Sequence, residues 1–259
     1  DYIQVHIPEI MVSNFKKKQN KLKLFYQFID KIKVKELNIL NQNDLFMPNI
    51  DYINFVKSKF DFSTITVAHK KYATSEKRNE YNLPLHLLSP WLNPVPYQVK
   101  TFEEKENLII YSPDKIQWIP NETKLRKEDI INNLKLKLPK YTFKEIKDLK
   151  YDDYKELASK AKFSITFGEG LDGYFIETVF SGGISFAVYN PYFFSDEFKD
   201  FETLFSSFNE LNDKIADKII SLENSKNYNE VHNKISSNVN NIYSLNHLEN
   251  DLIEFYTKK

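Results

Sequence analysis

Short apolar runs of strand length alternate with amphipathic runs of helical length along most of the chain. This alternation is typical of βαβ units, in which parallel strands form a sheet and helices cover its faces. Before residue 90 we expect strands at 2–7, 36–41, 62–68 and 84–88, and helices within 17–33 and near 49–59. The pattern therefore predicts an α/β protein.

A proline-rich segment interrupts the alternation. Pro90, Pro94 and Pro96 lie within 89–105, and proline favours extended backbone at itself and at the preceding residue. We expect a stiff connector here and a domain boundary near residue 100, which gives domains 1–100 and 101–259. The first domain is small for this architecture and the chain starts at Asp1 without methionine, so we expect this domain to be short or incomplete.

The alternation restarts after the connector. We expect strands at 107–111, 141–146, 162–167 and 184–189, and helices at 126–137, 151–161 and 174–181. From about residue 199 the tail is expected to be mostly helical. One face of that helical tail would carry Leu204, Phe208, Leu211, Ile215 and Ile219.

Composition narrows the class of protein. A chain of 259 residues with 41% hydrophobic residues can bury a sizeable core. Lys+Arg and Asp+Glu both count 36, so net charge gives no support for nucleic-acid binding. The absence of cysteine excludes disulfides and thiolate metal sites. Without a visible signal peptide or a membrane-length apolar run, we expect a cytoplasmic protein.

Glycines concentrate just after the expected strand 162–167. Four of the five in the chain are Gly168, Gly170, Gly173 and Gly182. Glycine permits left-handed backbone and close approach of a ligand, so this spacing predicts a binding loop. Two acids, Glu169 and Glu177, flank the loop.

The position of this loop indicates what it binds. In open parallel sheets, ligands lie beyond the carboxyl ends of strands, where helix N-termini present backbone N–H groups. We expect the amides near Gly170, Leu171, Asp172 and Gly173 to bind a diphosphate. Glu177, one turn into the next helix, would accept hydrogen bonds from the diol of a ribose.

The run Phe-Gly-Glu169-Gly, followed by Glu177 and then Ser-Gly-Gly before an apolar strand, resembles the Glu-x7-Glu signature of retaining GT-B glycosyltransferases. The resemblance covers 107–259 and implies two Rossmann-like domains facing a cleft. It implies that Glu169 is the catalytic carboxylate facing the donor sugar and that Glu177 holds the ribose. The implied reaction moves a sugar from a nucleoside-diphosphate donor to a glycan or lipid-linked acceptor, with retention and without a metal or other cofactor.

The same resemblance suggests further site residues. The family neutralises the diphosphate with an arginine and a lysine after the first strand of this domain, where the chain offers Lys115 and, as substitutes, Lys124 or Arg126. It often has a histidine after a strand of the first domain, a position matched by His69. His6 is a second candidate.

Other interpretations stay open. A non-catalytic GT-B-like subunit of a glycan-assembly complex fits the missing arginine, and a nucleotide-sugar epimerase would be separated by product analysis. Segment 15–33 pairs a basic face with an apolar one. It either packs on the sheet with its lysines in water or contacts an anionic membrane, at its inner face for a cytoplasmic protein. The sequence shows no Asp-x-Asp at a strand end, so we expect no metal site.

Overall fold

The computed structural model describes residues 1–41, 47, 49–90, 92, 98–116 and 125–257. The chain divides into two compact units: unit 1 holds Asp1–Pro90 and Asn246–Lys259, and unit 2 holds Trp91–Leu245. The last segment therefore groups with unit 1, whereas the sequence analysis assigned it to domain 101–259. Each unit has its own sheet and its own hydrophobic core.

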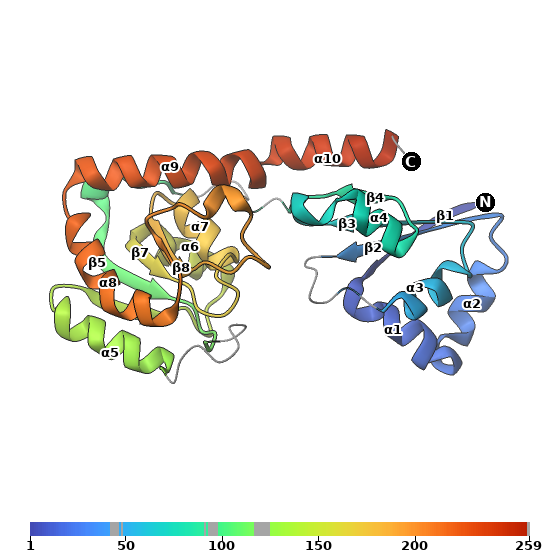
Figure 1. The fold of residues 1–259 in the computed structure, drawn as a ribbon, viewed down its shortest axis with the longest axis horizontal. Helices are drawn as coiled ribbons and strands as arrows, with labels where there is room; N and C mark the ends of the chain where they lie inside the picture. The colour runs from blue at the N-terminus through green and yellow to red at the C-terminus, as the bar shows by residue number, and fades with distance from the viewer. Residues whose placement is uncertain (42–46, 48, 91, 93–97, 117–124, 258–259) are drawn as a thin grey trace. The chain divides into compact units, whose positions relative to one another are not determined.

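The described part of unit 1 contains a sheet of four parallel strands in the order β1-β2-β3-β4. The strands are β1 (Tyr2–Pro8), β2 (Val34–Asn41), β3 (Phe62–Val67) and β4 (Leu85–Leu87). The helices are α1 (Glu9–Lys17), α2 (Lys23–Ile29), α3 (Ile50–Lys57), α4 (Ser75–Tyr81) and α10 (Leu245–Thr257), with short 3-10 turns η1 (Gln19–Leu22) and η3 (Lys70–Tyr72). Right-handed crossovers in this strand order place the connecting helices on one face. Figure 1 shows α1, α2 and α3 together on one side of the strands.

The two faces of this sheet differ in chemistry. On the helix-covered face, Leu37, Ile39 and Ile65 are buried in a cluster with Val12 and Val56. The opposite face is polar: Asn38 is fully buried, and its Nδ2 donates to Thr66 Oγ1 over 3.1 Å. Side chains alternate between faces along a strand, so Asn38, Thr64 and Thr66 lie together on this face and form the polar layer.

Helix α10 lies against the polar face. The Phe255 ring is 6.4 Å from the ring of His6 and 5.4 Å from that of His86. The carboxylate of Asp251 accepts the Ser89 N–H over 2.9 Å. The C-terminal helix therefore completes the core of unit 1.

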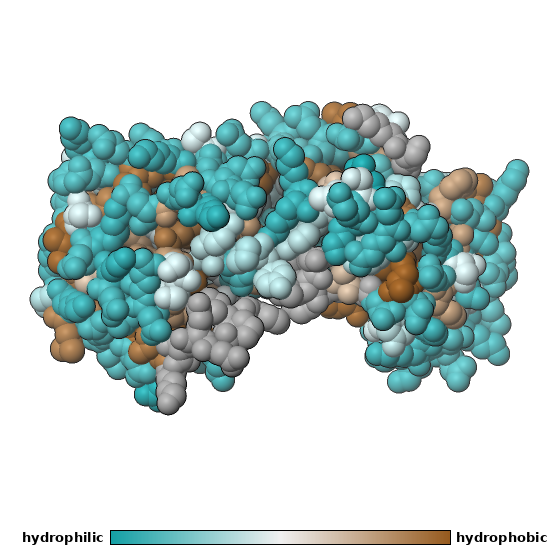
Figure 2. Space-filling view, viewed as in Figure 1, coloured by the Kyte–Doolittle hydropathy of each residue, from teal (hydrophilic) through white to brown (hydrophobic). Residues whose placement is uncertain are grey.

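The basic segment 15–33 forms the end of α1, the turn η1 and α2. Phe15 and Ile29 are buried, and the Phe15 ring packs edge-on against Phe25. Leu24 and Phe28 are 80% and 53% exposed on α2. On the face of the molecule in Figure 2, apolar residues form scattered patches among hydrophilic ones. The segment packs on the sheet through its apolar residues, and membrane contact stays a prediction.

The described part of unit 2 contains a five-stranded parallel sheet in the order β6-β5-β7-β8-β9. The strands are β5 (Glu106–Tyr111), β6 (Thr142–Glu145), β7 (Ala161–Ile165), β8 (Ile184–Val188) and β9 (Leu204–Phe205). The helices are α5 (Lys127–Lys137), α6 (Tyr151–Lys160), α7 (Gly173–Phe180), α8 (Phe208–Ser221) and α9 (Ser225–Tyr243), with 3-10 turns η4 (Phe102–Glu104) and η5 (Asp196–Phe198). This is a Rossmann-like doubly wound arrangement.

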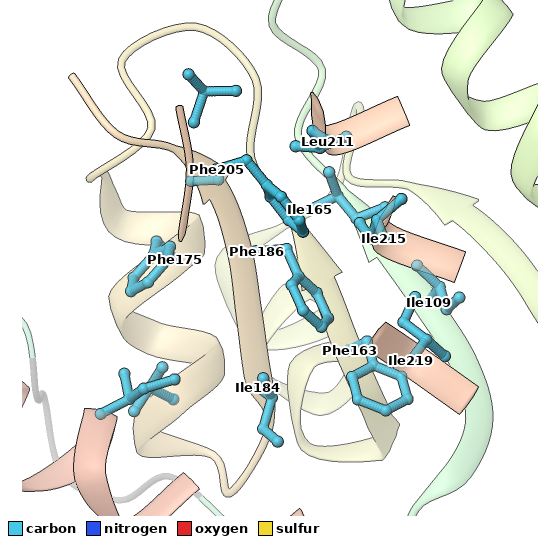
Figure 3. Close-up of a cluster of buried hydrophobic side chains, with 14 of the residues drawn as sticks. Ile109, Phe163, Ile165, Phe175, Ile184, Phe186, Phe205, Leu211, Ile215 and Ile219 are labelled. Atoms are coloured by element: carbon cyan, nitrogen blue, oxygen red, sulfur yellow. The ribbon is translucent and has the colours of Figure 1, made fainter. Parts of the chain in front are cut away.

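Helices cover both faces of the second sheet. Figure 3 shows Phe163 of β7 and Phe186 of β8 on the side of the sheet where Ile215 and Ile219 of α8 lie, while Phe175 comes from α7 on the other side of β8. Under α7 the sheet carries small side chains: Ser185 Oγ donates to the Phe175 carbonyl over 2.7 Å. The apolar strands predicted at 162–167 and 184–189 are therefore buried on both sides, as parallel strands usually are.

The structure differs from the sequence analysis in three local features. Leu204 lies in the short strand β9 and not on the helical face, which begins with α8 at Phe208. Helices α1 and α4 were not predicted. Helix α4 contains one buried residue, Tyr81, and therefore has no apolar periodicity. Among the described residues, no helix combines the length and the apolar run needed to cross a bilayer.

Lys105 links the C-terminal ends of two helices in unit 2 through hydrogen bonds. Its buried Nζ donates to the carbonyls of Ser159 and Ser181, each over 2.9 Å, at the C-terminal ends of α6 and α7. Burial, with a smaller contribution from the positive charge of Lys100, lowers the pKa of Lys105 to about 7. The folded protein therefore releases this proton near neutral pH, whereas an unfolded lysine keeps it up to about pH 10.4.

The free energy of unfolding should consequently depend on pH through Lys105. Above about pH 7 the unfolded state binds one proton more than the folded state, so the contribution of Lys105 to stability rises with pH. The difference between the wild type and Lys105→Met should increase from pH 7 to 9, with a slope approaching about 1.4 kcal/mol per pH unit. Urea unfolding across this range measures it. Lys160→Met, which removes an exposed lysine paired with Glu156, is the control and should show no such slope. A difference that is constant with pH would contradict the assignment.

Candidate site at the sheet switch point

The strand order of unit 2 fixes where a ligand would bind. The order β6-β5-β7-β8-β9 reverses direction between β5 and β7. In doubly wound sheets, the crevice beyond the carboxyl ends of the strands at such a switch point is the usual ligand site. The loop that follows β5 and the glycine loop that follows β7 both leave the sheet there.

The glycine loop is held to the segment after β5 and to its own first residues. Phe167 N–H donates to Ser112 Oγ over 2.9 Å, and Thr166 Oγ1 donates to the Gly170 carbonyl over 2.6 Å. Gly168 and Gly170 have φ of +75° and +85°, as expected for left-handed positions. A Cβ on Gly170 would lie 2.8 Å from the Phe194 ring. The loop is thus a fixed turn that requires glycine.

Asp172 caps the helix that follows this loop. Its Oδ1 accepts the Phe175 N–H over 2.9 Å, and α7 begins at Gly173. Burial raises the pKa of Asp172 well above its ordinary value, opposed by the Phe175 N–H and reinforced by Asp114 and Glu169. The Phe175 amide, close to those expected to bind a diphosphate, therefore already has a carboxylate partner. Leu171 is buried in the core, so only its backbone can face a ligand.

Glu169 lies between the two loops. Its side chain is half-buried, and burial together with the neighbouring Asp114 raises its pKa. Gly168 packs so closely on Asp114 that a Cβ there would lie 3.0 Å from the Asp114 Cβ. Three carboxylates, from Asp114, Glu169 and Asp172, thus gather at the switch point. Within the described part of the chain, no group of His, Cys, Asp or Glu has an arrangement suited to a metal ion.

Glu177 lines a pocket beside the glycine loop. Glu177 is 8% exposed, and Tyr151 OH donates to its Oε1 over 3.3 Å. The pocket has a volume of about 350 Å³. It is lined by Ile146, Asp148, Leu149, Tyr151, Tyr154, Gly173, Tyr174 and Glu177. The rings of Tyr154 and Tyr174 meet edge-on, with centroids 5.6 Å apart. A buried acceptor and aromatic walls at a switch point suit a nucleoside.

The predicted cations are not gathered around this pocket. Lys115 is exposed in the loop after β5, and Lys124 lies outside the described residues. Arg126 forms an ion pair of 3.1 Å with Asp129 at the start of α5. Sequence reasoning missed Lys127, whose Nζ donates to the Pro113 carbonyl over 2.8 Å and to Glu145 Oε1 over 2.5 Å. Because Lys and Arg are frequent along the chain, residue spacing did not single out Lys127.

The two histidines that the sequence analysis singled out, His69 and His6, occupy different settings. His69 lies just after the end of β3, as predicted, and its ring packs edge-on against the ring of Tyr72. Burial, with a contribution from Lys71, lowers the pKa of His69 to about 4, so its ring is neutral at pH 7 and can act as a neutral hydrogen-bond donor. His6 lies within β1, not at its end, and its Nδ1 is 3.2 Å from Asn38 Nδ2 in the layer beneath α10. That position is a correction to the strand-end role expected for His6.

No protein-family model matches the sequence, and the search of curated proteins gave no significant match. Among solved structures, sucrose-phosphate synthase from Thermosynechococcus elongatus is similar with a TM-score of 0.54 and 11% sequence identity, over 95% of this chain and 78% of that chain. A structure of accessory secretory proteins 1, 2 and 3 in Streptococcus pneumoniae is similar with a TM-score of 0.49 and 14% identity, over 99% of this chain and 54% of that chain. The first likeness bears on the fold alone. It confirms the predicted α/β fold of Rossmann-like units, that of GT-B glycosyltransferases.

Proposed function

We propose that the chain binds a nucleoside-diphosphate sugar in unit 2 and transfers the sugar to a glycan or lipid-linked acceptor. The observation that carries the proposal is the buried Glu177 carboxylate on the wall of a pocket of about 350 Å³ at the switch point. A ribose diol donates to this carboxylate, and the base packs against Tyr151 and Tyr174. A nucleoside needs both features, an acceptor and an apolar wall.

The remaining roles in this proposal are those that the resemblance to GT-B glycosyltransferases implies. The donor sugar lies toward Glu169, and the diphosphate crosses the loop Gly170 to Gly173 with Lys115 as the proposed cation. The acceptor hydroxyl oxygen bonds to the anomeric carbon as the bond to the diphosphate oxygen breaks, and the hydroxyl proton passes to the departing diphosphate. His69, neutral at pH 7, donates a hydrogen bond to a sugar hydroxyl. Metal independence and retention of configuration form part of this proposal.

One observation favours a second candidate, a non-catalytic subunit of a glycan-assembly complex. The Asp172 carboxylate accepts the Phe175 N–H, and its pKa is raised by burial and by the charges of the nearby Asp114 and Glu169. A diphosphate at this position would meet three carboxylates. Under this proposal the pocket still binds a nucleoside but supports no turnover.

Thermal-shift screening separates these functions. UDP-, GDP-, ADP- and CMP-linked sugars would each be titrated against the full chain, followed by product analysis of any that bind. For a transferase we expect one donor to raise the melting temperature and to be consumed with acceptor. A ligand at a hundred times its dissociation constant adds about 2.7 kcal/mol of stability. Binding without consumption identifies the non-catalytic subunit, and no shift with any donor contradicts both nucleotide-binding proposals.

A further inference from the structure

Unit 1 contains a second pocket, with a volume of about 440 Å³, that the proposed transfer reaction does not use. It is lined by Glu36, Leu37, Lys57, Asp61, Phe62, Ser63, Thr64, Asn82, Leu83 and Pro84. These residues surround the start of β3, whereas His69 follows the opposite end of the same strand. The pocket is therefore a separate site within unit 1.

The pocket exists because β4 begins late. The ladder between β3 and β4 starts with Ile65 opposite Leu85, so Phe62, Ser63 and Thr64 extend beyond the start of β4. In a parallel ladder, alternate residues direct both backbone polar groups toward the same neighbour. Ile65 N–H donates to the Pro84 carbonyl and Val67 accepts from Leu88, which shows that odd-numbered residues of β3 face β4. The N–H and C=O of Ser63 consequently face the pocket.

The ladder cannot continue to Ser63. Its next bond would run from the N–H of residue 84 to the Ser63 carbonyl, but residue 84 is proline and has no N–H. The bond after that would join Ser63 N–H to the Asn82 carbonyl, which instead accepts from Lys57 Nζ over 2.9 Å. The side chain of Ser63 is a further polar group at this position: its Oγ is buried and makes no hydrogen bond within the described residues. One strand residue thus offers a backbone donor and a backbone acceptor side by side.

A donor beside an acceptor matches a secondary amide, which presents one C=O and one N–H. The other walls suit a sugar ring. Phe62 is 63% exposed and provides an apolar surface, while Leu37 and Leu83 form a buried apolar floor that fits a methyl group. Lys57, Asp61 and Asn82 carry polar groups for hydroxyls, and the Asp61 carboxylate already accepts Lys35 N–H through Oδ2.

We propose that this pocket binds an N-acetylhexosamine residue of a glycan. The acetamido group pairs with the backbone of Ser63, its methyl lies on Leu37 and Leu83, and the pyranose ring packs on Phe62. A volume of about 440 Å³ lies within the range of small-ligand sites. The site binds sugar whether or not unit 2 binds a nucleotide.

The test is a titration of the full chain with the methyl glycosides of N-acetylglucosamine, N-acetylgalactosamine and glucose, followed by NMR. At least one N-acetyl sugar should bind at least about tenfold more tightly than glucose, because one amide pair contributes roughly 1.4 kcal/mol. Phe62→Ala should weaken binding about tenfold. Phe28→Ala removes another exposed phenylalanine of unit 1 and is the matched control, which should bind as the wild type does.

A second variant tests the amide pairing directly. Pro84→Ala supplies the missing N–H, so it should extend the ladder to Ser63, keep the fold and weaken binding of the N-acetyl sugar. Glu177→Ala should leave this binding unchanged, which distinguishes failure here from failure of the proposed transfer. Equal affinity for glucose and the N-acetyl sugars, wild-type binding by Phe62→Ala, or no saturation up to about 10 mM would overturn the proposal.

Discussion

Replacing Gly182 by alanine should destabilise unit 2 by about 3 kcal/mol, the sum of roughly 1–2 kcal/mol for a left-handed L-residue and roughly 1–3 kcal/mol for overpacking. Gly182 has φ of +84° in the turn that ends α7, where its N–H donates to the Val179 carbonyl. A Cβ there would lie 2.4 Å from the Lys100 carbonyl oxygen. Because that neighbour is backbone, no side-chain rotation relieves the contact.

Gly173→Ala, at the start of α7, is the matched control. Gly173 does not have positive φ, and a Cβ there would meet its nearest neighbour, Glu177 Oε1, at an ordinary 3.7 Å. Alanine also favours helix over glycine by up to about 1 kcal/mol, so this variant should be neutral or slightly stabilised. Urea midpoints of the two variants compare them directly. Equal stability would mean that the turn after α7 does not have the described conformation.

The strands that are buried on both faces were predictable from the sequence, because such strands appear as short, continuous apolar runs. Segments such as 162–167 and 184–189 are short, apolar and bounded by turns, and the structure places β7 and β8 there. Helix α4 was not predictable, because Ser75–Tyr81 buries one apolar residue and is specified by its cap, in which Thr74 Oγ1 accepts Lys77 N–H. Strand β9 was missed for a related reason. Two residues, Leu204 and Phe205, also fit the apolar spacing of the helix that follows them.

The candidate site was predictable in outline but not in its electrostatics. Glycine content located the loop, and left-handed φ at Gly168 and Gly170 agrees with it. The cap made by Asp172 depends on which way one carboxylate turns, and sequence spacing does not encode that choice. Nor does spacing reveal that Asp114 lies close enough to raise the pKa of Glu169. Whether this loop binds a diphosphate therefore depends on the direction of the Asp172 side chain, and not on residue type alone.

Glu177 therefore gives a clearer test of nucleotide binding in this pocket than the residues of the glycine loop do. Its role depends on the diol and not on the phosphates, so it holds for a catalytic and for a non-catalytic chain. Glu177→Ala should raise the dissociation constant of the bound nucleotide about 10- to 100-fold, the loss expected for hydrogen bonds to a charged acceptor of about 1.5–3 kcal/mol. Calorimetry with the nucleotide found by thermal shift measures this change.

Two further variants, Asp153→Ala and Glu169→Ala, serve as comparisons for Glu177→Ala. Asp153→Ala removes an exposed carboxylate from α6, the helix that supplies Tyr151 to the pocket, and should bind nucleotide as the wild type does. Glu169→Ala should bind the nucleotide nearly normally but lower turnover, since this carboxylate faces the sugar in the proposed complex. If Glu177→Ala and Glu169→Ala both kept wild-type binding and kinetics, the two acids would have no role in the site. A loss of binding confined to Glu177→Ala, with no turnover in the wild type, would instead identify a nucleotide-binding subunit without transferase activity.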